Sequence, residues 1–361
     1  MRSERKDVAR SYIRYRYKKE VARKSKDDFF KAIGEKLAAV NVQNNNANVD
    51  EASFGGRIGE ASSVMTRQYA LDYLVSKMAR DNHLNNEVYI HDLDSYAVGS
   101  HNCLSIPFDK LLNKGFNTRQ ADIRPANSVN TAFQLVAVIF QLQSLQQFGG
   151  VSATHLDWTM VPFVRKSFYK HYIKGWKYFS DAKTPSGIIE ICSLGIDNVS
   201  ITNDLYTKTQ YSNFPQELQD KIYNYALEAT VDEINQAIEA MYHNLNTLQS
   251  RSGNQLPFTS INYGTCTLPE GRMIIKGLIE GSIKGVGKFH KTSIFPCGIF
   301  QIMKGVNKEP GTPNYDLKRL ALESTALRLY PNYANVDWSG NAGYDVNDPR
   351  TYFSTINKTV A

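Results

Sequence analysis

The chain has 361 residues, of which 42% are hydrophobic and 21% are charged, and its 23 glycines and 12 prolines are too few for a fibrous or disordered protein. It contains no apolar run of about 18 residues, and its charged N-terminus has no apolar stretch, so neither a membrane span nor a secretory signal is predicted. We expect a soluble, cytoplasmic, globular protein with no membrane partner.

The net charge is +7, and much of the basic excess precedes residue 40. A basic balance can indicate a nucleic acid, a nucleotide phosphate or an anionic surface as a partner. A basic N-terminal run is also typical of a solvated helix face. The four cysteines lie far apart without a C-x-x-C pair, so we expect free thiols and no metal site (Cys103, Cys192, Cys266 and Cys297).

Hydrophobic periodicity predicts long helices separated by strands and polar loops. Helices are expected over residues 4–40, 60–82, 129–148, 159–179, 214–246, 271–285 and 311–329. Strands are expected over 88–90, 258–266 and 293–303, with a further extended run after residue 103. Gly55 and Gly56 are expected to form a turn, with a phosphate contact as the alternative. This alternation predicts an α/β architecture.

Two of the predicted helices have distinctive compositions. The helix over 129–148 is apolar nearly all round, which predicts burial in the core or in a subunit interface. Ser128 is its expected N-cap, and Gly149 its expected end. The helix over 159–179 is basic, and its aromatic residues recur at helical spacing. That spacing favours a core face over base stacking.

The stretch from Glu87 to Phe108 holds a single cysteine, Cys103, after a loop rich in histidine and aspartate. A thiol in this setting could be a redox residue in a pocket. The local residues alone favour a buried structural cysteine, because free cysteine is among the most buried residue types.

Several long strings resemble one family, the anaerobic (class III, glycyl-radical) ribonucleoside-triphosphate reductases. They include NANVDEASFGGRIGEAS, NNEVYIHDLDSYAVGSHNCLSIPF, TSINYGTCTLPEG and LALESTALRLYPNYANVDWSGNAG, and they span roughly Asn44 to Asp348. The string DVARSYIRYRYKKE resembles the exit helix of the ATP-cone, a regulatory domain. Residues 1–25 are therefore expected to be a remnant of that helix or a linker, and 26–361 the N-terminal part of the reductase barrel domain.

The resemblance implies the first half of a ten-stranded α/β barrel, with long helices at a dimer interface. In the family a finger loop threads the barrel and carries the thiyl-radical cysteine. A C-terminal glycyl-radical loop and a four-cysteine zinc site follow it. The implied partners are a second copy of the chain, the radical-generating activase and a separate C-terminal fragment, while nucleic acid is not expected.

The implied reaction is reduction of a ribonucleoside triphosphate to the 2′-deoxyribonucleoside triphosphate used in DNA replication. Formate is the implied reductant. The glycyl radical is generated by an iron–sulfur activase that uses S-adenosylmethionine, and ATP and dNTPs act as allosteric effectors.

The resemblance also assigns roles to three residues. Asn102 and Cys103 match the pair beneath the ribose, where Cys103 would protonate the departing 2′-hydroxyl and Asn102 would hydrogen-bond the ribose. Lys170 matches a lysine that contacts the effector phosphate, a use suited to a compact point charge. No metal ligand is predicted in this chain.

The sequence departs from the family pattern after the run Tyr352 to Thr355. In the family a YFST-like run leads into Met-Gly-Cys-Arg, which carries the radical cysteine, whereas here YFST is followed by INKTVA. No glycyl-radical motif occurs, and Cys297 is interpreted as structural. We expect no turnover by this chain alone and activity only with a complementary part. The alternatives are a non-catalytic, dimerising dNTP-binding remnant and a basic nucleic-acid-binding protein.

Overall fold

The computed structural model describes residues 26–38, 53–99, 103–147, 149–180, 200–201, 214–249, 255–338 and 343–352. The chain divides into two compact units. The first comprises Met1–Asn102, Leu145–Phe148 and Gln249–Leu256, and the second comprises Cys103–Ser144, Gly149–Leu248 and Pro257–Ala361. No helix within these described ranges is both long and apolar enough to span a membrane.

The first unit is helical. Its elements are α2 (Lys26–Leu37), α3 (Phe54–Tyr69), the π-helical turn η1 (Ala70–Leu74), α4 (Lys77–Leu84) and α5 (Leu93–Tyr96). Ser53 caps α3 by accepting a hydrogen bond from the backbone N–H of Gly56 at 3.0 Å. The turn predicted at Gly55 and Gly56 is therefore wrong, because both lie in the first turn of this helix.

The helix predicted over 60–82 is confirmed in type, but it begins earlier and is interrupted after Leu74. The strand predicted over 88–90 is wrong, because these residues pair with no strand. The backbone N–H of Ile90 instead donates to Nδ1 of His83 at 3.0 Å, which holds this stretch against α4.

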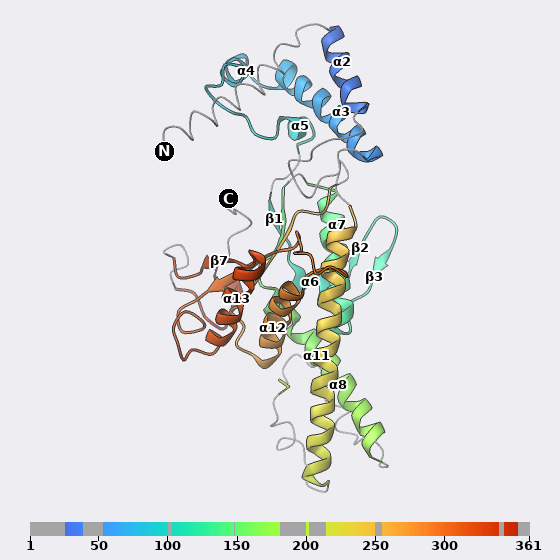
Figure 1. The fold of residues 1–361 in the computed structure, drawn as a ribbon, viewed down its shortest axis with the longest axis vertical. Helices are drawn as coiled ribbons and strands as arrows, with labels where there is room; N and C mark the ends of the chain where they lie inside the picture. The colour runs from blue at the N-terminus through green and yellow to red at the C-terminus, as the bar shows by residue number, and fades with distance from the viewer. Residues whose placement is uncertain are drawn as a thin grey trace. The chain divides into compact units, whose positions relative to one another are not determined.

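The second unit is built on one parallel sheet (Figure 1). Its strands are β1 (Leu104–Ser105), β4 (Val151–Ala153), β5 (Thr259–Tyr263), β6 (Cys297–Ile302) and β7 (Asn332–Asn335). They lie side by side in the order β1-β4-β5-β6-β7, and every neighbouring pair is parallel. This arrangement confirms the predicted α/β class with its five-stranded sheet.

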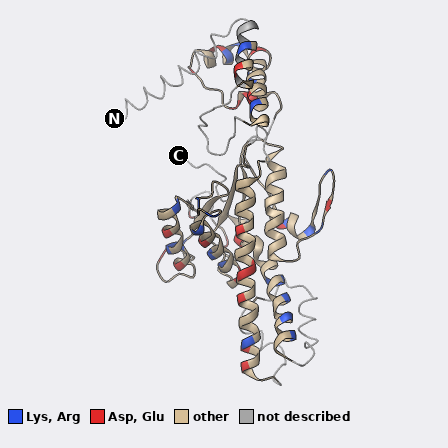
Figure 2. Cartoon of the chain, turned by 45° about the vertical axis from the view of Figure 1, so that its right-hand side comes forward, with Lys and Arg blue, Asp and Glu red and all other residues tan. Residues whose placement is uncertain are grey.

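Helices connect successive strands, as parallel pairing requires. They are α6 (Phe108–Lys114), α7 (Val129–Ser144), α8 (Leu156–Phe179), α11 (Gln216–Thr247), α12 (Pro269–Lys284) and α13 (Tyr315–Arg328). A small antiparallel hairpin, β2 (Phe116–Asn117) and β3 (Asp122–Ile123), follows α6, and a 3-10 turn, η4 (Pro349–Thr351), lies near the C-terminus. The longest helices, α8 and α11, pack side by side (Figures 1 and 2).

Helix α7 shows how local sequence sets one of these elements. Its N-cap prediction is confirmed, because Ser128 Oγ accepts from the backbone N–H of Thr131 at 3.2 Å. The backbone N–H of Val129 donates to Ser167 Oγ of α8 at 2.9 Å. The helix ends at Ser144, before the predicted glycine pair. Half of its residues are buried in this chain's own core, as its apolar composition predicts.

Candidate active site

The two faces of the parallel sheet differ in chemistry. Side chains alternate between faces along a strand, and paired residues of parallel strands share a face. Ser152 pairs with Ser260, and Ser260 with Cys297, while Asn262 pairs with Ile299, two residues before Gln301. Ser152, Ser260, Asn262 and Gln301 therefore lie on one face together with Cys297 and Ile299, and this face is called here the polar face. The other face carries mainly apolar side chains (Val151, Ile261, Tyr263 and Phe300), with Thr259 as a polar member.

The polar face is buried, but several of its polar groups form no hydrogen bond to a described residue. Ser152, Ser260 and Gln301 are 0% exposed. The hydroxyls of the two serines, and both amide atoms of Gln301, form no hydrogen bond to any described residue. Buried polar groups are normally hydrogen-bonded, and leaving one unpaired costs about 1–3 kcal/mol. Strands buried on both faces are normally apolar. This face is therefore suited to a hydrogen-bonding occupant.

Cys103 lies at the amino end of the sheet, one residue before β1, and it is exposed and forms no disulfide with another described cysteine. The interpretation of Cys103 as a buried core cysteine is therefore wrong. Asn102 and His101 lie outside the described residues. His91, Asp92 and Asp94, which precede Cys103 in sequence, belong to the other compact unit. There His91 Nδ1 lies 2.5 Å from Asp92 Oδ1, and Asp94 accepts a hydrogen bond from Ser63.

At the carboxyl end of the sheet, Asp157 in the first turn of α8 holds the turn that follows β5. Its Oδ2 atom accepts the backbone N–H groups of Gly264, Thr265 and Cys266 at 2.9, 3.0 and 3.0 Å. Burial raises the pKa of this carboxyl group, and the backbone hydrogen bonds oppose that rise. The side-chain amide of Asn314 donates to the carbonyls of Gly264 and Cys266. The turn is consequently fixed from both sides.

Gly264 is required in this turn. Its φ of +125° is strained for residues with a side chain, and a Cβ atom there would lie 3.1 Å from the carbonyl oxygen of Gln301. The sequence shows the glycine in the string NYGTC, but its constraint becomes visible only when β5 and β6 are paired.

His155 lies beside the polar face, between β4 and α8. Its Nδ1 atom forms no hydrogen bond to a described residue. Burial lowers the pKa of the His155 imidazole to about 4. The side chains of Gln301 and Asp109 act in the opposite direction and raise the pKa. Gln301 is therefore close to the imidazole ring, although the two side chains form no hydrogen bond of ordinary geometry. The imidazole is consequently neutral near pH 7.

Lys170, the expected effector-phosphate residue, is exposed on α8. Three further lysines of this helix lie at similar intervals, Lys166, Lys174 and Lys177, and Figure 2 marks the basic positions of the ribbon in blue along α8. Arg165 does not belong to this solvated set, because it is buried and forms an ion pair of 2.7 Å with Glu270.

The aromatic residues of α8 confirm the predicted core face, since most are buried (Phe163, Phe168, Tyr169, Tyr172 and Trp176).

Sequence reasoning missed Glu233, which joins three helices beside Lys170. Its carboxylate lies 2.8 Å from Nε2 of His171 and accepts the hydroxyl proton of Ser167 at 3.1 Å. Burial would raise the pKa of Glu233, but the bonds from His171 and Ser167 outweigh it and leave the pKa lowered. The backbone N–H of Asn130 on α7 also donates to this carboxylate, at 3.4 Å. No signal near residue 233 in the sequence could have indicated this junction, because its partners are 62 to 103 residues away.

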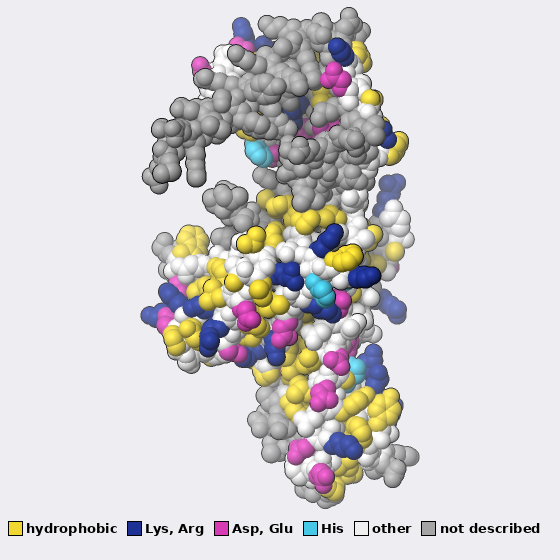
Figure 3. All heavy atoms as spheres, viewed as in Figure 1, with side chains coloured by type: hydrophobic (Ala, Val, Ile, Leu, Met, Phe, Trp, Pro, Cys, Tyr) yellow, Lys and Arg dark blue, Asp and Glu magenta, His cyan; other side chains and the backbone are white. Residues whose placement is uncertain are grey.

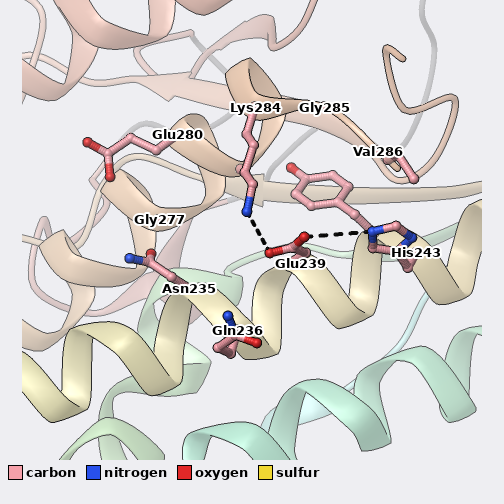
Figure 4. Close-up of a pocket in the computed structure, with 11 residues that line it drawn as sticks. Asn235, Gln236, Glu239, His243, Gly277, Glu280, Lys284, Gly285 and Val286 are labelled. Carbon is pink, nitrogen blue, oxygen red and sulfur yellow. Dashed lines mark hydrogen bonds and ion pairs between the residues drawn. The ribbon is translucent and has the colours of Figure 1, made fainter. Parts of the chain in front are cut away.

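A pocket of about 180 Å³ lies between α11 and α12 (Figure 4). Glu239 lines it and pairs with Lys284 at 2.8 Å and with His243 at 3.8 Å. Acidic and basic side chains are interspersed over the face on which these helices lie (Figure 3). Because the charges of the pocket already compensate each other, and because it is formed by helices and not by the sheet, we do not assign the active site to it.

Cys266 and Cys297 are buried thiols of the second unit. Burial raises the pKa values of the Cys266 and Cys297 thiols, so both are protonated and poorly reactive. Cys297 lies 3.5 Å from the Tyr330 hydroxyl at the start of β6. Within the described ranges, no three His, Cys, Asp or Glu side chains are grouped to hold a metal ion.

A family model described as "Anaerobic ribonucleoside-triphosphate reductase" matches residues 45–351. This chain belongs to the anaerobic ribonucleoside-triphosphate reductase family. Reductases of this name from Haemophilus influenzae and Escherichia coli K12 are each 28% identical to it, over 93% and 92% of the chain. The reductase of Enterobacteria phage T4 is 28% identical over 80% of the chain. The chain spans about two fifths of these relatives, namely 42%, 41% and 41% of their lengths.

Solved reductase structures share the fold. One described as "Anaerobic ribonucleotide reductase" has a TM-score of 0.56 and 15% identity, and the match covers 94% of this chain and 50% of that one. The Thermotoga maritima reductase, solved with dATP and CTP, has a TM-score of 0.50 and 15% identity, with coverage of 87% and 48%. This reductase chain thus has the fold of about half of those proteins.

Proposed function

We propose that this chain acts in the anaerobic reduction of ribonucleoside triphosphates to 2′-deoxyribonucleoside triphosphates, supplying the first half of the reductase barrel. Residues 26–361 would form the N-terminal part of that domain, and residues 1–25 a remnant of a regulatory helix. The observation that carries the proposal is the family match over residues 45–351, on a chain whose parallel sheet has one buried polar face. Such a face suits a barrel interior better than a closed core.

Cys103 is proposed as the proton donor to the substrate. The C2′–O bond of the ribose breaks, and the hydroxyl group takes the thiol proton and leaves as water. Formate supplies the two electrons and is oxidised to carbon dioxide. The exposed thiol of Cys103 at the amino end of the sheet is compatible with this role, and Asn102 would hydrogen-bond the ribose. A glycyl radical, made by the activase, would supply the unpaired electron that starts the reaction.

The polar face is proposed to receive the finger loop that carries the radical cysteine. The unpaired groups of Ser152, Ser260 and Gln301 would then bond to that loop. The remaining family sequence, which lies beyond the part matched here, would provide the loop. Turnover is then expected only when that part is present.

Lys170 is proposed to bind the phosphate of a dNTP effector, with α7 and α8 forming the interface of a homodimer. Its exposure leaves the ammonium group accessible to an anion. The Glu233 junction would hold α7 and α8 in a fixed relation beside Lys170, because it bonds to residues of both.

The test is reconstitution. The purified chain is mixed anaerobically with the complementary polypeptide, activase, S-adenosylmethionine, formate and a ribonucleoside triphosphate, and deoxyribonucleotide is measured. We expect product from the full mixture and none without the complementary polypeptide. Cys103→Ser should reduce turnover at least about 100-fold, the scale of losing a proton-transfer group, while substrate binding persists.

Lys170→Ala should weaken dNTP binding about tenfold, because one charge-assisted hydrogen bond to the phosphate is lost. Lys174→Ala is the control, since Lys174 is an exposed lysine one helical turn away. Binding of dNTP by the wild-type chain without any product in the full mixture would contradict the catalytic proposal. That result would favour a non-catalytic nucleotide-binding protein.

A further inference from the structure

The loop that follows α12 holds a phenylalanine side chain out in solvent. Phe289 is 76% exposed. On either side of it, Val286 and Lys291 form an isolated antiparallel bridge, with N···O distances of 2.7 and 3.1 Å. The backbone N–H of His290 donates to the carbonyl of Gly287 at 3.1 Å and closes the turn between them. Residues 286–291 are called here the Phe289 loop.

The base of the Phe289 loop is clamped by Arg328 of α13. Two nitrogen atoms of its guanidinium group donate to the carbonyl of Ile283 at 2.9 and 2.7 Å, and the third donates to the carbonyl of His290 at 2.9 Å. Gly285 is required below the loop, because its φ is +73° and a Cβ atom there would lie 2.7 Å from the carbonyl oxygen of His290. Specific bonds therefore join the loop to α12 and α13.

His290, next to Phe289, has a strained backbone. Its φ of +50° lies in the left-handed region, which residues with a side chain rarely adopt. Such conformations persist only where the surrounding structure enforces them, and they cluster at functional sites. An exposed aromatic ring on a fixed backbone is typical of an interface anchor, because little conformational entropy is lost when it binds. The Phe289 loop has both features.

The pocket between α11 and α12 lies directly beside this loop, because Val286 belongs to the loop and also lines the pocket. Tyr242 and two glycines of α12, Gly277 and Gly281, are further lining residues (Figure 4). The volume of about 180 Å³ is sufficient for a phenyl ring, since an engineered cavity of about 150 Å³ binds benzene. An anchor and a pocket of matching size thus share one face of the second unit.

The charges of the loop and the pocket are complementary. Lys288 and Lys291 are exposed on the loop, whereas Glu239 and Glu280 line the pocket. Glu239 already pairs with Lys284 at 2.8 Å. The partner of Glu280 is an exposed lysine of α12 at 3.7 Å. Exposed pairs of this kind contribute little to stability, so Glu280 can exchange its partner for a lysine of another chain.

We propose that this face binds a second copy of the chain, with Phe289 of each protomer inserted into the α11–α12 pocket of the other. A twofold contact requires one patch that serves both partners, and the adjacent anchor and pocket supply such a patch. The contact is separate from the proposed α7–α8 interface, because none of its residues lies on those helices. The inference goes beyond the proposed function and does not depend on it.

The first test is sedimentation of the purified chain from about 1 to about 200 μM, the range suited to weak, transient contacts. We expect an association step, from monomer to dimer or upwards from a dimer joined by α7 and α8. Phe289→Ala should weaken this step at least about 100-fold, because the twofold axis removes the anchor twice and each loss costs about tenfold or more. Phe54→Ala, which truncates a phenylalanine that is 79% exposed on α3, is the matched control and should associate like the wild type.

The second test mixes two variants that fail in different ways. Gln236→Trp covers the pocket from an exposed position on its rim and leaves the Phe289 loop intact. Each variant alone forms neither insertion. An equimolar mixture with Phe289→Ala should associate about tenfold more tightly than either variant alone, because one anchor meets one open pocket. Thermal unfolding should be unchanged in both variants, since both positions are exposed.

Recovery of association in the mixture supports the proposal. The proposal is overturned if the wild type shows no association step, or if Phe289→Ala leaves that step unchanged. Loss of association in Phe289→Ala without recovery in the mixture also overturns it, because the anchor would then bind elsewhere. Failure of the reconstitution assay overturns the proposed function and leaves this contact untouched, because sedimentation of the chain requires no turnover.

Discussion

His155 shows how one buried residue makes stability depend on pH. Its pKa is about 4 in the folded chain against 6.5 for an unperturbed histidine. As pH falls from 6.5 towards 4, the unfolded chain binds a proton that the folded chain does not. The folded state therefore loses up to about 3 kcal/mol across this window, and the stability is fully present above pH 6.5.

We predict that His155→Gln flattens this dependence. Urea unfolding at about pH 7 and pH 4.5 should show a smaller loss of stability for the variant than for the wild type. His243→Gln, which changes an exposed histidine on α11, is the control and should behave like the wild type. Equal losses for His155→Gln and the wild type would show that His155 is already charged or exposed in the folded chain.

At the scale of elements, Asp157 connects the start of α8 to the end of β5. One carboxylate oxygen receives three backbone N–H groups of the turn after β5. Asp157→Asn would direct an amide group towards those donors or leave them unpaired. We therefore predict that the free energy of unfolding falls by about 3 kcal/mol or more. Chemical denaturation of the chain measures it.

Asp316→Asn is the control for that substitution, since Asp316 is largely exposed and pairs with Arg272. It should cost no more than about 1 kcal/mol, as surface ion pairs do. A similar small loss for Asp157→Asn would mean that the turn is held by its backbone and not by the carboxylate.

The elements that the sequence predicted well are those with long periodic patterns. The helices α8, α11 and α12 lie within a few residues of their predicted ranges, because each repeats an apolar stripe over several turns. Strands β4 and β7 were missed, since three and four residues carry no readable alternation. The predicted strand over 88–90 has the right residue types, but no strand among the described residues pairs with it.

The candidate site was predictable only in part. Cys103 was found because its surroundings resemble a known family. Ser152 and Gln301 were not found. A serine or glutamine in the sequence does not indicate a site until the strand register places both residues on one buried face. In the sequence Tyr352 is visible only as part of the YFST run. Its hydrogen bond to Thr265 depends on packing between residues far apart in the chain.

At the scale of the whole molecule, the polar face predicts a stabilising partner. If the complementary polypeptide fills that face, the folded state is stabilised by RT ln(1 + [L]/Kd), about 2.7 kcal/mol at a hundredfold excess over Kd. The melting temperature of the mixture should therefore rise with the concentration of the complement. A bulky substitution on the face, Ser260→Phe, should reduce the shift. The shift for this variant is measured from the melting temperature of the variant alone. If the melting temperature of the wild type does not rise at a saturating concentration of the complement, the proposal is contradicted.

The strand order has a consequence for biosynthesis. The sheet runs β1-β4-β5-β6-β7, which is also the order in which these strands leave the ribosome. Each new strand can dock beside the one made before it, after the helices that connect the two, without waiting for a distant partner. Assembly of this kind proceeds vectorially during translation. The newest strand, β7, always arrives at an open border of the sheet, where the backbone is ready to pair with the next segment offered to it.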